Sequence, residues 1–323
     1  LKLDTKCPII DRTGTLNRQL KVLSKLPKKY EGELKFGKIA NRRAKNILDK
    51  CTKEGRDLRV CYSGGIDSTV ALIGLMKYKD RYPDVTVSVL MSQDSIDEYP
   101  MFYEEHIKGN LDVWMSKDRD LNELIAKKTD KPCYIVTGEL GDQLFGSAIM
   151  FRNTPRLGVP WEDEFSPDFI KYFKPLMDLN PDPDPSVANA LWWLNFTLKY
   201  QWVQLRMYVM AKDVPYSDFI HFFGNTKFQQ WSMNTPMSAK FPDFKDPASY
   251  KKIAKKYILD YTGDKKYFKN KKKKGSLQGT VDIGIGKLLK RVKEDMSIVH
   301  KESKVSIEQN EIDGVIEIGV HWE

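Results

Sequence analysis

Short apolar runs alternate with amphipathic segments through the first half of the chain. Four runs have the length and composition of strands, and three segments between them have the spacing of helices. The predicted strands are residues 58–62, 85–91, 111–114 and 133–137, and the predicted helices are residues 69–79, 99–108 and 118–128. This alternation is typical of an α/β fold with a doubly wound parallel sheet. In such sheets ligands bind beyond the carboxyl ends of the strands.

The rest of the chain shows a different pattern. Residues 1–57 are expected to form a mainly helical segment, with helical spacing at residues 39–51, and residues 58–151 form the α/β core. Residues 152–185 hold seven prolines, which predicts a long ordered loop or a linker. The later helical patterns are residues 187–211, 218–223 and 249–261.

The two remaining predicted segments complete the division of the chain. Residues 152–286 are expected to form a subdomain of the Pro-rich loop and helices, with helical additions to the core. Residues 287–323 are a charged C-terminal extension, helix-like with a strand-like end at residues 314–320. The most apolar long stretch, residues 187–211, contains residues such as Lys199 and Arg206. It is therefore expected to be a buried helix and not a membrane span.

Composition indicates a globular protein. Of 323 residues, 41% are hydrophobic and 30% are charged, with a net charge of +9. The four cysteines form no Cys-x-x-Cys pair and the four histidines are scattered, so neither a disulfide framework nor a zinc site is indicated. Since no signal peptide or membrane span is evident, we expect a cytoplasmic protein without a membrane partner.

The most informative motif is Tyr-Ser-Gly-Gly-Ile-Asp-Ser-Thr at residues 62–69, between a predicted strand and a predicted helix. Such a loop directs backbone N–H groups to one point at the positive end of a helix dipole, which suits phosphate. Gly64 and Gly65 allow close approach. Hydroxyl donors come from Ser63, Ser68 and Thr69. Asp67 is explained if it holds magnesium, and the complete motif favours this interpretation over a plain Gly-Ser turn.

A second Gly-rich turn follows the strand at residues 133–137. Residues 137–146 read Thr-Gly-Glu-Leu-Gly-Asp-Gln-Leu-Phe-Gly, and the strand order predicts that they lie beside the first loop. Asp142 alone would be an ordinary helix cap. With Glu139 on an exposed turn, the two acids are better interpreted as a metal-binding and acid–base pair.

The first motif resembles the PP-loop of ATP pyrophosphatases, and differs from the Walker and Gly-x-Gly-x-x-Gly loops. Both motifs in order resemble the synthetase domain of asparagine synthetases, which β-lactam synthetases and lasso-peptide cyclases share. Further similarities at residues 214–218, 257–259 and 271–276 extend the resemblance over about residues 58–280. It implies an adenine nucleotide alpha hydrolase-like fold.

The resemblance also implies an activity. It implies a ligase that uses ATP and Mg²⁺ to adenylate a carboxylate, releases pyrophosphate and transfers the acyl group to an amine. The implied nucleotide-binding residues are Ser63, Gly64, Gly65, Asp67, Ser68, Met91, Ser92 and Gly138, with Thr69 as a further hydroxyl donor. The implied magnesium ligands are Asp67 and Asp142, and the implied catalytic residues are Glu139 and Lys273.

Several departures leave the substrates open. The residues that differ from the usual family pattern are Leu140, Gln143, Ser147 and Ser276. The carboxylate and the amine donor are either free or carried by a peptide, a protein or a nucleobase. Only 57 residues precede the first predicted strand, and the first cysteine is Cys7. No glutaminase is therefore expected, and the amine comes from ammonia, an amine-bearing substrate or a separate amine-delivering partner.

Residues 265–274 contain seven lysines. Three interpretations of this run are possible. It is a solvated face, a nucleic-acid-binding patch with Tyr267 and Phe268, or a catalytic loop in which Lys273 points inward. Motif order favours the catalytic loop, and nucleic-acid binding is not favoured. Two other functions stay open: another PP-loop activity such as tRNA or nucleobase modification, and a non-catalytic nucleotide- or nucleic-acid-binding module. The absence of paired cysteines argues against thiolation, and the two intact aspartates argue against a decayed site.

Overall fold

The computed structural model divides into two compact units, each discontinuous in sequence. The core unit comprises Tyr30–Gly141 and Ala211–Thr280, and the second unit comprises Leu1–Lys29, Asp142–Met210 and Val281–Glu323. The units therefore alternate along the chain, whereas the predicted segments follow one another. The structure describes residues 10–16, 22, 24–117, 121–127, 131–148, 151, 154, 156–210, 214–272, 305–312 and 315–322.

A five-stranded, all-parallel sheet forms the centre of the core unit. The strands are β1 (Asp57–Cys61), β2 (Val87–Met91), β3 (Asp112–Met115), β4 (Cys133–Thr137) and β5 (Phe219–His221). Their order is β3-β2-β1-β4-β5, and each neighbouring pair is parallel. The chain runs outward from β1 to β3 and returns with β4 beside β1. This reversal is the switch point at which α/β sheets bind ligands. The four predicted strands and the parallel α/β architecture are confirmed.

The fifth strand was not predicted. Residues 218–223 were expected to be helical, and this expectation is wrong. A 3-10 turn, η4 (Tyr216–Asp218), leads into β5, which pairs with β4 from Ile135↔Phe219 to Thr137↔His221. All residues of β5 are buried. A short buried run has no alternation by which sequence could separate strand from helix.

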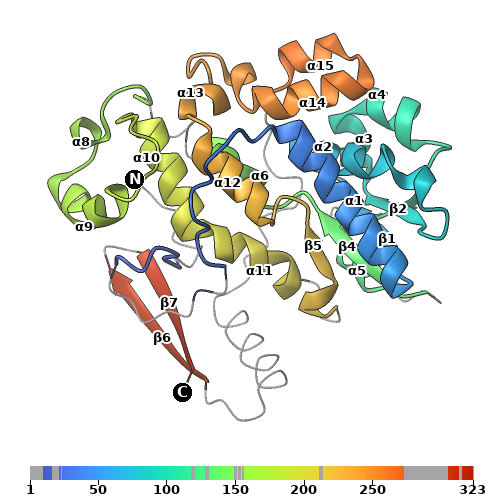
Figure 1. The fold of residues 1–323 in the computed structure, drawn as a ribbon, viewed down its shortest axis with the longest axis horizontal. Helices are drawn as coiled ribbons and strands as arrows, with labels where there is room; N and C mark the ends of the chain where they lie inside the picture. Colours follow the sequence, from blue (N-terminus) through green and yellow to red (C-terminus); the bar gives the residue numbers. More distant parts are fainter. Residues whose placement is uncertain are drawn as a thin grey trace. The chain divides into compact units, whose positions relative to one another are not determined.

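Three long helices of the core unit pack together next to the sheet. α1 (Phe36–Glu54) lies beside α2 (Ile66–Met76), and α14 (Lys252–Thr262) contacts both (Figure 1). Nearly all of α2 is buried, because it lies against β4 as well as these helices. The other described α-helices of the core unit are α3 (Gln93–Glu98), α4 (Pro100–Phe102), α5 (Asn122–Ala126), α12 (Thr226–Asn234), α13 (Met237–Lys240) and α15 (Lys265–Asn270). α6 (Gly141–Phe145) begins at the last residue of this part of the core unit, and its other residues belong to the second unit. Shorter turns are η1 (Lys79–Arg81), the π-helix η2 (Tyr103–Ile107) and η5 (Pro247–Ser249).

The second unit is mainly helical where it is described. α10 (Val187–Leu194), the π-helix η3 (Asn195–Lys199) and α11 (Tyr200–Met210) form one run, which confirms a helix where the apolar stretch predicted it. The expected loop at residues 152–185 instead contains α8 (Trp161–Glu164) and α9 (Pro167–Met177). Ser166 caps α9 through the N–H of Phe169, and Pro167 occupies its first turn, where proline is well tolerated.

The described C-terminal residues form an antiparallel hairpin. β7 (Val315–Trp322) confirms the strand-like end, whereas β6 (Val305–Ile312) lies in a stretch that was predicted to be helix-like. In the parts of the chain that the structure describes, no helix combines the length and the apolar character that crossing a membrane requires.

Candidate functional site

Residues 63–68 leave the carboxyl end of β1 as a loop and enter the first turn of α2 (Ile66–Met76), as predicted. Gly64 has a φ of 69°. A Cβ atom there would lie 2.4 Å from the carbonyl oxygen of Ser95, so both conformation and space require glycine. Gly65 is the N-cap of α2, and Asp67 lies in its first turn. The loop thus presents the amino end of a buried helix at the switch point of the sheet, which favours an anion.

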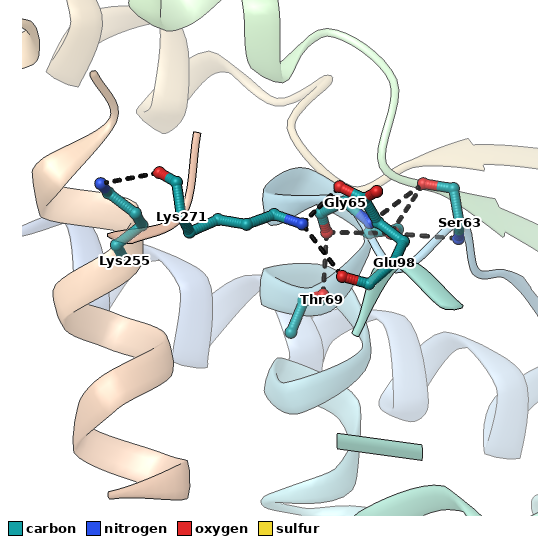
Figure 2. A network of polar contacts seen from close by, with 7 residues as sticks. Ser63, Gly65, Thr69, Glu98, Lys255 and Lys271 are labelled. Carbon is teal, nitrogen blue, oxygen red and sulfur yellow. Dashed lines mark hydrogen bonds and ion pairs between the residues drawn. The ribbon is translucent and has the colours of Figure 1, made fainter. Parts of the chain in front are cut away.

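The hydroxyl groups of this loop hold its shape. Ser68 Oγ donates to the carbonyl of Gly65 (3.1 Å), accepts from the N–H of Ser63 (3.2 Å) and lies 3.1 Å from Ser63 Oγ. Thr69 is fully buried, and its hydroxyl donates to the same Gly65 carbonyl at 2.8 Å (Figure 2). Ser63 is only half-buried. Of the three predicted hydroxyl donors, Ser63 is therefore the most accessible to a ligand.

The carboxylate of Asp67 is paired with Lys251, a residue that the sequence analysis missed. Lys251 Nζ lies 2.7 Å from Oδ1 and 2.5 Å from Oδ2. The Lys251 side chain is fully buried, and that of Asp67 is 16% exposed. Lys251 precedes α14 with a left-handed φ of 57°, which is unusual for lysine. Because a buried ammonium is costly unless it is paired, this contact fixes a cation at the loop.

The second Gly-rich turn lies directly against Asp67, as predicted. A Cβ at Gly138 would lie 2.7 Å from the backbone nitrogen of Ser68, and a Cβ at Gly141 would lie 2.3 Å from Asp67 Oδ1. Both positions therefore require glycine. Between them Leu140 is buried with a φ of 74°, a conformation that costs a leucine energy. The backbone of this turn thus forms one wall around the Asp67 carboxylate.

Glu139 belongs to the same turn and is tied to the sheet through its backbone. Its N–H donates to Thr137 Oγ1 at 3.3 Å. Thr137 Oγ1 also lies 2.8 Å from Nδ1 of the buried His221 on the neighbouring strand β5. His221 was not selected from the sequence, because the strand that carries it was not recognised.

Asp142 follows the turn and belongs to the second unit. Its backbone carbonyl accepts a hydrogen bond of 2.9 Å from Asn195 Nδ2 in the π-helix η3. The neighbouring Gln143 donates to Asn195 Oδ1 at 3.3 Å. Asn195 therefore fixes the first turn of α6. The pairing of Asp142 with Asp67 around one metal ion stays a prediction.

A second buried ion pair lies at the loop (Figure 2). Lys271 Nζ contacts Glu98 Oε1 and donates to the Glu98 carbonyl at 3.2 Å. Glu98 is next to the loop, since a Cβ at Gly64 would lie 2.8 Å from Glu98 Cβ. The buried Lys255 donates to the carbonyls of Ala248 and, at 3.3 Å, Lys271. Burial lowers the pKa of Lys255 to about 8.

The remaining predicted residues are distributed as follows. Met91 and Ser92 lie at the carboxyl end of β2, the strand next to β1. Met91 is fully buried, and Ser92 caps α3 in a capping box with Ser95. Their role at an adenine ring stays a prediction. Lys273 lies outside the described residues, and so its catalytic role also stays a prediction.

The described residues contain no cluster of three or more His, Cys, Asp or Glu side chains that could hold a metal ion. Magnesium needs fewer, because it is usually held by one or two carboxylates with substrate phosphates and water. Asp67 fits this mode, since a carboxylate has about four acceptor positions. Magnesium would bind Asp67 beside the Lys251 ammonium. Two neighbouring cations require the negative charge of phosphates between them.

Neither the known protein-family models nor the curated proteins include a match to this chain. Function is therefore inferred from the two motifs and from the contacts of the described residues. Those contacts bring residues 63–68, Gly138, Gly141 and Lys251 together, and join Glu98 and Lys271 beside them.

Proposed function

We propose that this protein is an ATP-dependent, AMP-forming ligase that joins a carboxylate to an amine, similar in type to the synthetase domain of asparagine synthetases. The observation that carries the proposal is the buried Lys251 ammonium on Asp67, at the amino end of α2. A helix amino end suits a polyphosphate, and the ion pair holds the Asp67 carboxylate where it would bind magnesium on that polyphosphate. The chain that leads into this helix has the sequence that resembles a PP-loop.

The proposed reaction has two steps. A carboxylate oxygen of the substrate attacks the α-phosphorus of ATP, the bond from that phosphorus to the bridging oxygen breaks, and pyrophosphate leaves. The amine nitrogen then attacks the acyl carbon, the bond to AMP breaks, and the nitrogen loses a proton. Negative charge develops on the two leaving groups, so catalysis is chiefly electrostatic.

The residues of the site divide this work. Residues 63–68 and the first turn of α2 bind the phosphates. Lys251 holds the Asp67 carboxylate beside the phosphates, and Lys273 is the proposed cation that offsets charge on the departing pyrophosphate. Glu139 is the candidate acceptor for the proton of the amine. Magnesium held by Asp67 and Asp142 would add charge neutralisation when bound.

The test is to separate the nucleotide products formed from ATP and Mg²⁺ in the presence of pooled carboxylates and amines. We expect AMP and pyrophosphate, formed only when a carboxylate is present. Lys251→Met should lower kcat by about 10²-fold, because the Asp67 carboxylate loses the partner that holds it in place. The control is Lys256→Met, which removes an exposed lysine of α14, the helix that Lys251 precedes. ADP and orthophosphate as products, or AMP formation without any carboxylate, would overturn the proposal.

A further inference from the structure

We propose that Glu98 is a positioning residue that anchors Lys271 at residues 63–68 and thereby fixes the chain where the lysine run of residues 271–274 begins. The inference rests on the proposed function, because the proposed catalytic residue Lys273 follows Lys271 by two positions in the sequence. Sequence similarity alone pointed to the lysines of this segment and did not select Glu98. The geometry assigns it a role through three sets of contacts.

The ion pair itself is almost completely enclosed. The side chains of Lys271 and Glu98 are only 9% and 7% exposed. Lys271 Nζ contacts two oxygens of Glu98 and lies 5.4 Å from the centre of the Tyr267 ring. Desolvation of both charges offsets much of their attraction, so such a pair is weak evidence for stability. Buried ion pairs are better known for selecting one arrangement of the chain over others. Here the pair fixes the position of Lys271, the residue that follows α15.

Glu98 is held from two sides. Its Cβ packs against the loop at Gly64, where no other residue type fits. The next residue, Tyr99, stacks on Tyr267 with ring centres 4.0 Å apart. The Tyr99 hydroxyl also donates to Asp264, the N-cap of α15, at 3.3 Å. The end of α3 is therefore joined to both the loop and α15, and it offers Lys271 a fixed partner.

The backbone of Lys271 is fixed as well. Its N–H donates to the Tyr267 carbonyl at 2.9 Å, and its carbonyl accepts from Lys255 Nζ at 3.3 Å. Figure 2 shows the side chain of Lys271 extended toward Glu98, with Lys255 at its carbonyl. Lys255 follows Lys251, the N-cap of α14, by about one helical turn, so the start of α14 provides both the partner of Asp67 and the donor to the Lys271 carbonyl. A lysine held at its nitrogen, its carbonyl and its ammonium suits an anchor better than a mobile catalytic group.

The first experiment tests the anchor without ATP. Trypsin cleaves after lysine, so the rate of cleavage after Lys271 and Lys272, mapped by mass spectrometry, reports how firmly the chain is held at Lys271. Glu98→Gln keeps the size of the side chain and removes its charge. We expect cleavage there to become about tenfold faster. The control is Glu104→Gln, which breaks an exposed ion pair with Lys108 and should leave this cleavage rate unchanged. An unchanged cleavage rate in Glu98→Gln would overturn the anchor.

The second experiment measures AMP formation. Glu98→Gln and Lys271→Met should each lower kcat by about 10²-fold, the size of effect expected from a misplaced catalytic segment, with a smaller change in KM for ATP. Lys271→Arg should keep most of the activity, because a guanidinium also pairs with a carboxylate. Loss of activity in both Lys271 variants with normal activity in Glu98→Gln would overturn the positioning role. A wild-type protein that forms no AMP would refute the proposed function, whereas the trypsin result would still decide the anchor.

Discussion

Lys251 Nζ bridges both carboxylate oxygens of Asp67, and nothing of the Lys251 side chain reaches solvent. From sequence alone, Asp67→Asn should nearly abolish turnover and leave the fold intact, because it removes the charge of a magnesium ligand with little change of shape. The ion pair changes this expectation. Removing one partner of a buried pair costs about 3–5 kcal/mol. We expect the unfolding free energy of Asp67→Asn, measured by urea denaturation, to fall by about 3 kcal/mol.

A double variant separates this effect from loss of packing. Asp67→Asn combined with Lys251→Met leaves no unpaired buried charge. It should therefore be clearly more stable than Asp67→Asn alone. If the double variant loses as much stability as the sum of the two single variants, the charges of Asp67 and Lys251 do not stabilise each other in the folded protein.

The glycine turn against Asp67 offers a second test. A methyl group at Gly141 would lie 2.3 Å from Asp67 Oδ1, and one at Gly138 would lie 2.7 Å from the Ser68 nitrogen. Gly141→Ala and Gly138→Ala should each destabilise the protein by about 1–3 kcal/mol, as overpacked sites do. Both variants should also weaken binding of a non-hydrolysable ATP analogue.

The matched control is Gly37→Ala in the helix α1. A Cβ there would meet the ring of Tyr257 at 3.4 Å, an ordinary contact. This change should be neutral or stabilise by up to about 1 kcal/mol, because alanine favours helix. Wild-type nucleotide affinity in Gly141→Ala would show that the turn does not shape the site.

The parts of the fold that the sequence predicted correctly are those determined by residues close together in the chain, such as apolar runs and glycine pairs. Apolar runs of strand length predicted β1 to β4. The glycines at residues 64 and 65 predicted a sharp turn whose backbone lies close to another segment, and Gly64 does lie against the backbone of Ser95. The same signals placed the second turn beside the first, because carboxyl ends of neighbouring parallel strands lie at one edge. The contacts of Gly138 and Gly141 agree with that prediction.

The missed residues have no local signal. Lys251 and Asp67 are 184 positions apart, and Lys271 and Glu98 are 173 apart. Nothing in the sequence distinguishes Lys251 from the other members of a set of 53 lysines and arginines. Only the packing of α14 on α2 brings it to the loop. Pairings of this kind depend on tertiary structure, and a hydrophobic pattern does not encode them residue by residue.

The π-helix in the second unit provides a third prediction. Asn195 donates to the Asp142 carbonyl and accepts from Gln143, and both Asn195 and Gln143 are buried. Asn195→Ala would leave these polar groups without that partner, at a cost of about 1–3 kcal/mol. Guanidinium denaturation should show this loss. If Asp142 holds magnesium, the apparent Mg²⁺ requirement for AMP formation should also rise.

A conservative variant gives the control. Asn195→Asp keeps the acceptor for Gln143 and loses the donor to the Asp142 carbonyl. It should therefore raise the Mg²⁺ concentration required for AMP formation, while the hydrogen bond from Gln143 is kept. An Asn195→Ala protein with wild-type stability and an unchanged Mg²⁺ requirement would show that the π-helix does not support α6.

The buried Lys255 predicts a pH dependence of stability. Burial lowers its pKa from 10.5 to about 8, and Asp246 only partly offsets this effect. Between these two values the unfolded chain binds more protons than the folded protein at this position, so stability contributed by Lys255 rises with pH across that window. Below about pH 8 the ammonium is charged in both the folded and the unfolded state. The folded protein then bears the whole free-energy cost of burying this charge, and that cost no longer changes with pH.

Comparison with Lys255→Met isolates this residue from the tyrosines that titrate at high pH. The difference in unfolding free energy, wild type minus Lys255→Met, should increase between pH 8 and pH 10.5 and be flat below pH 8. Lys256→Met, which removes an exposed neighbour on α14, should show no such trend. A flat difference for Lys255→Met across the whole range would mean that the ammonium is solvated in the folded protein. Its contact with the Lys271 carbonyl would then contribute little to the anchored segment.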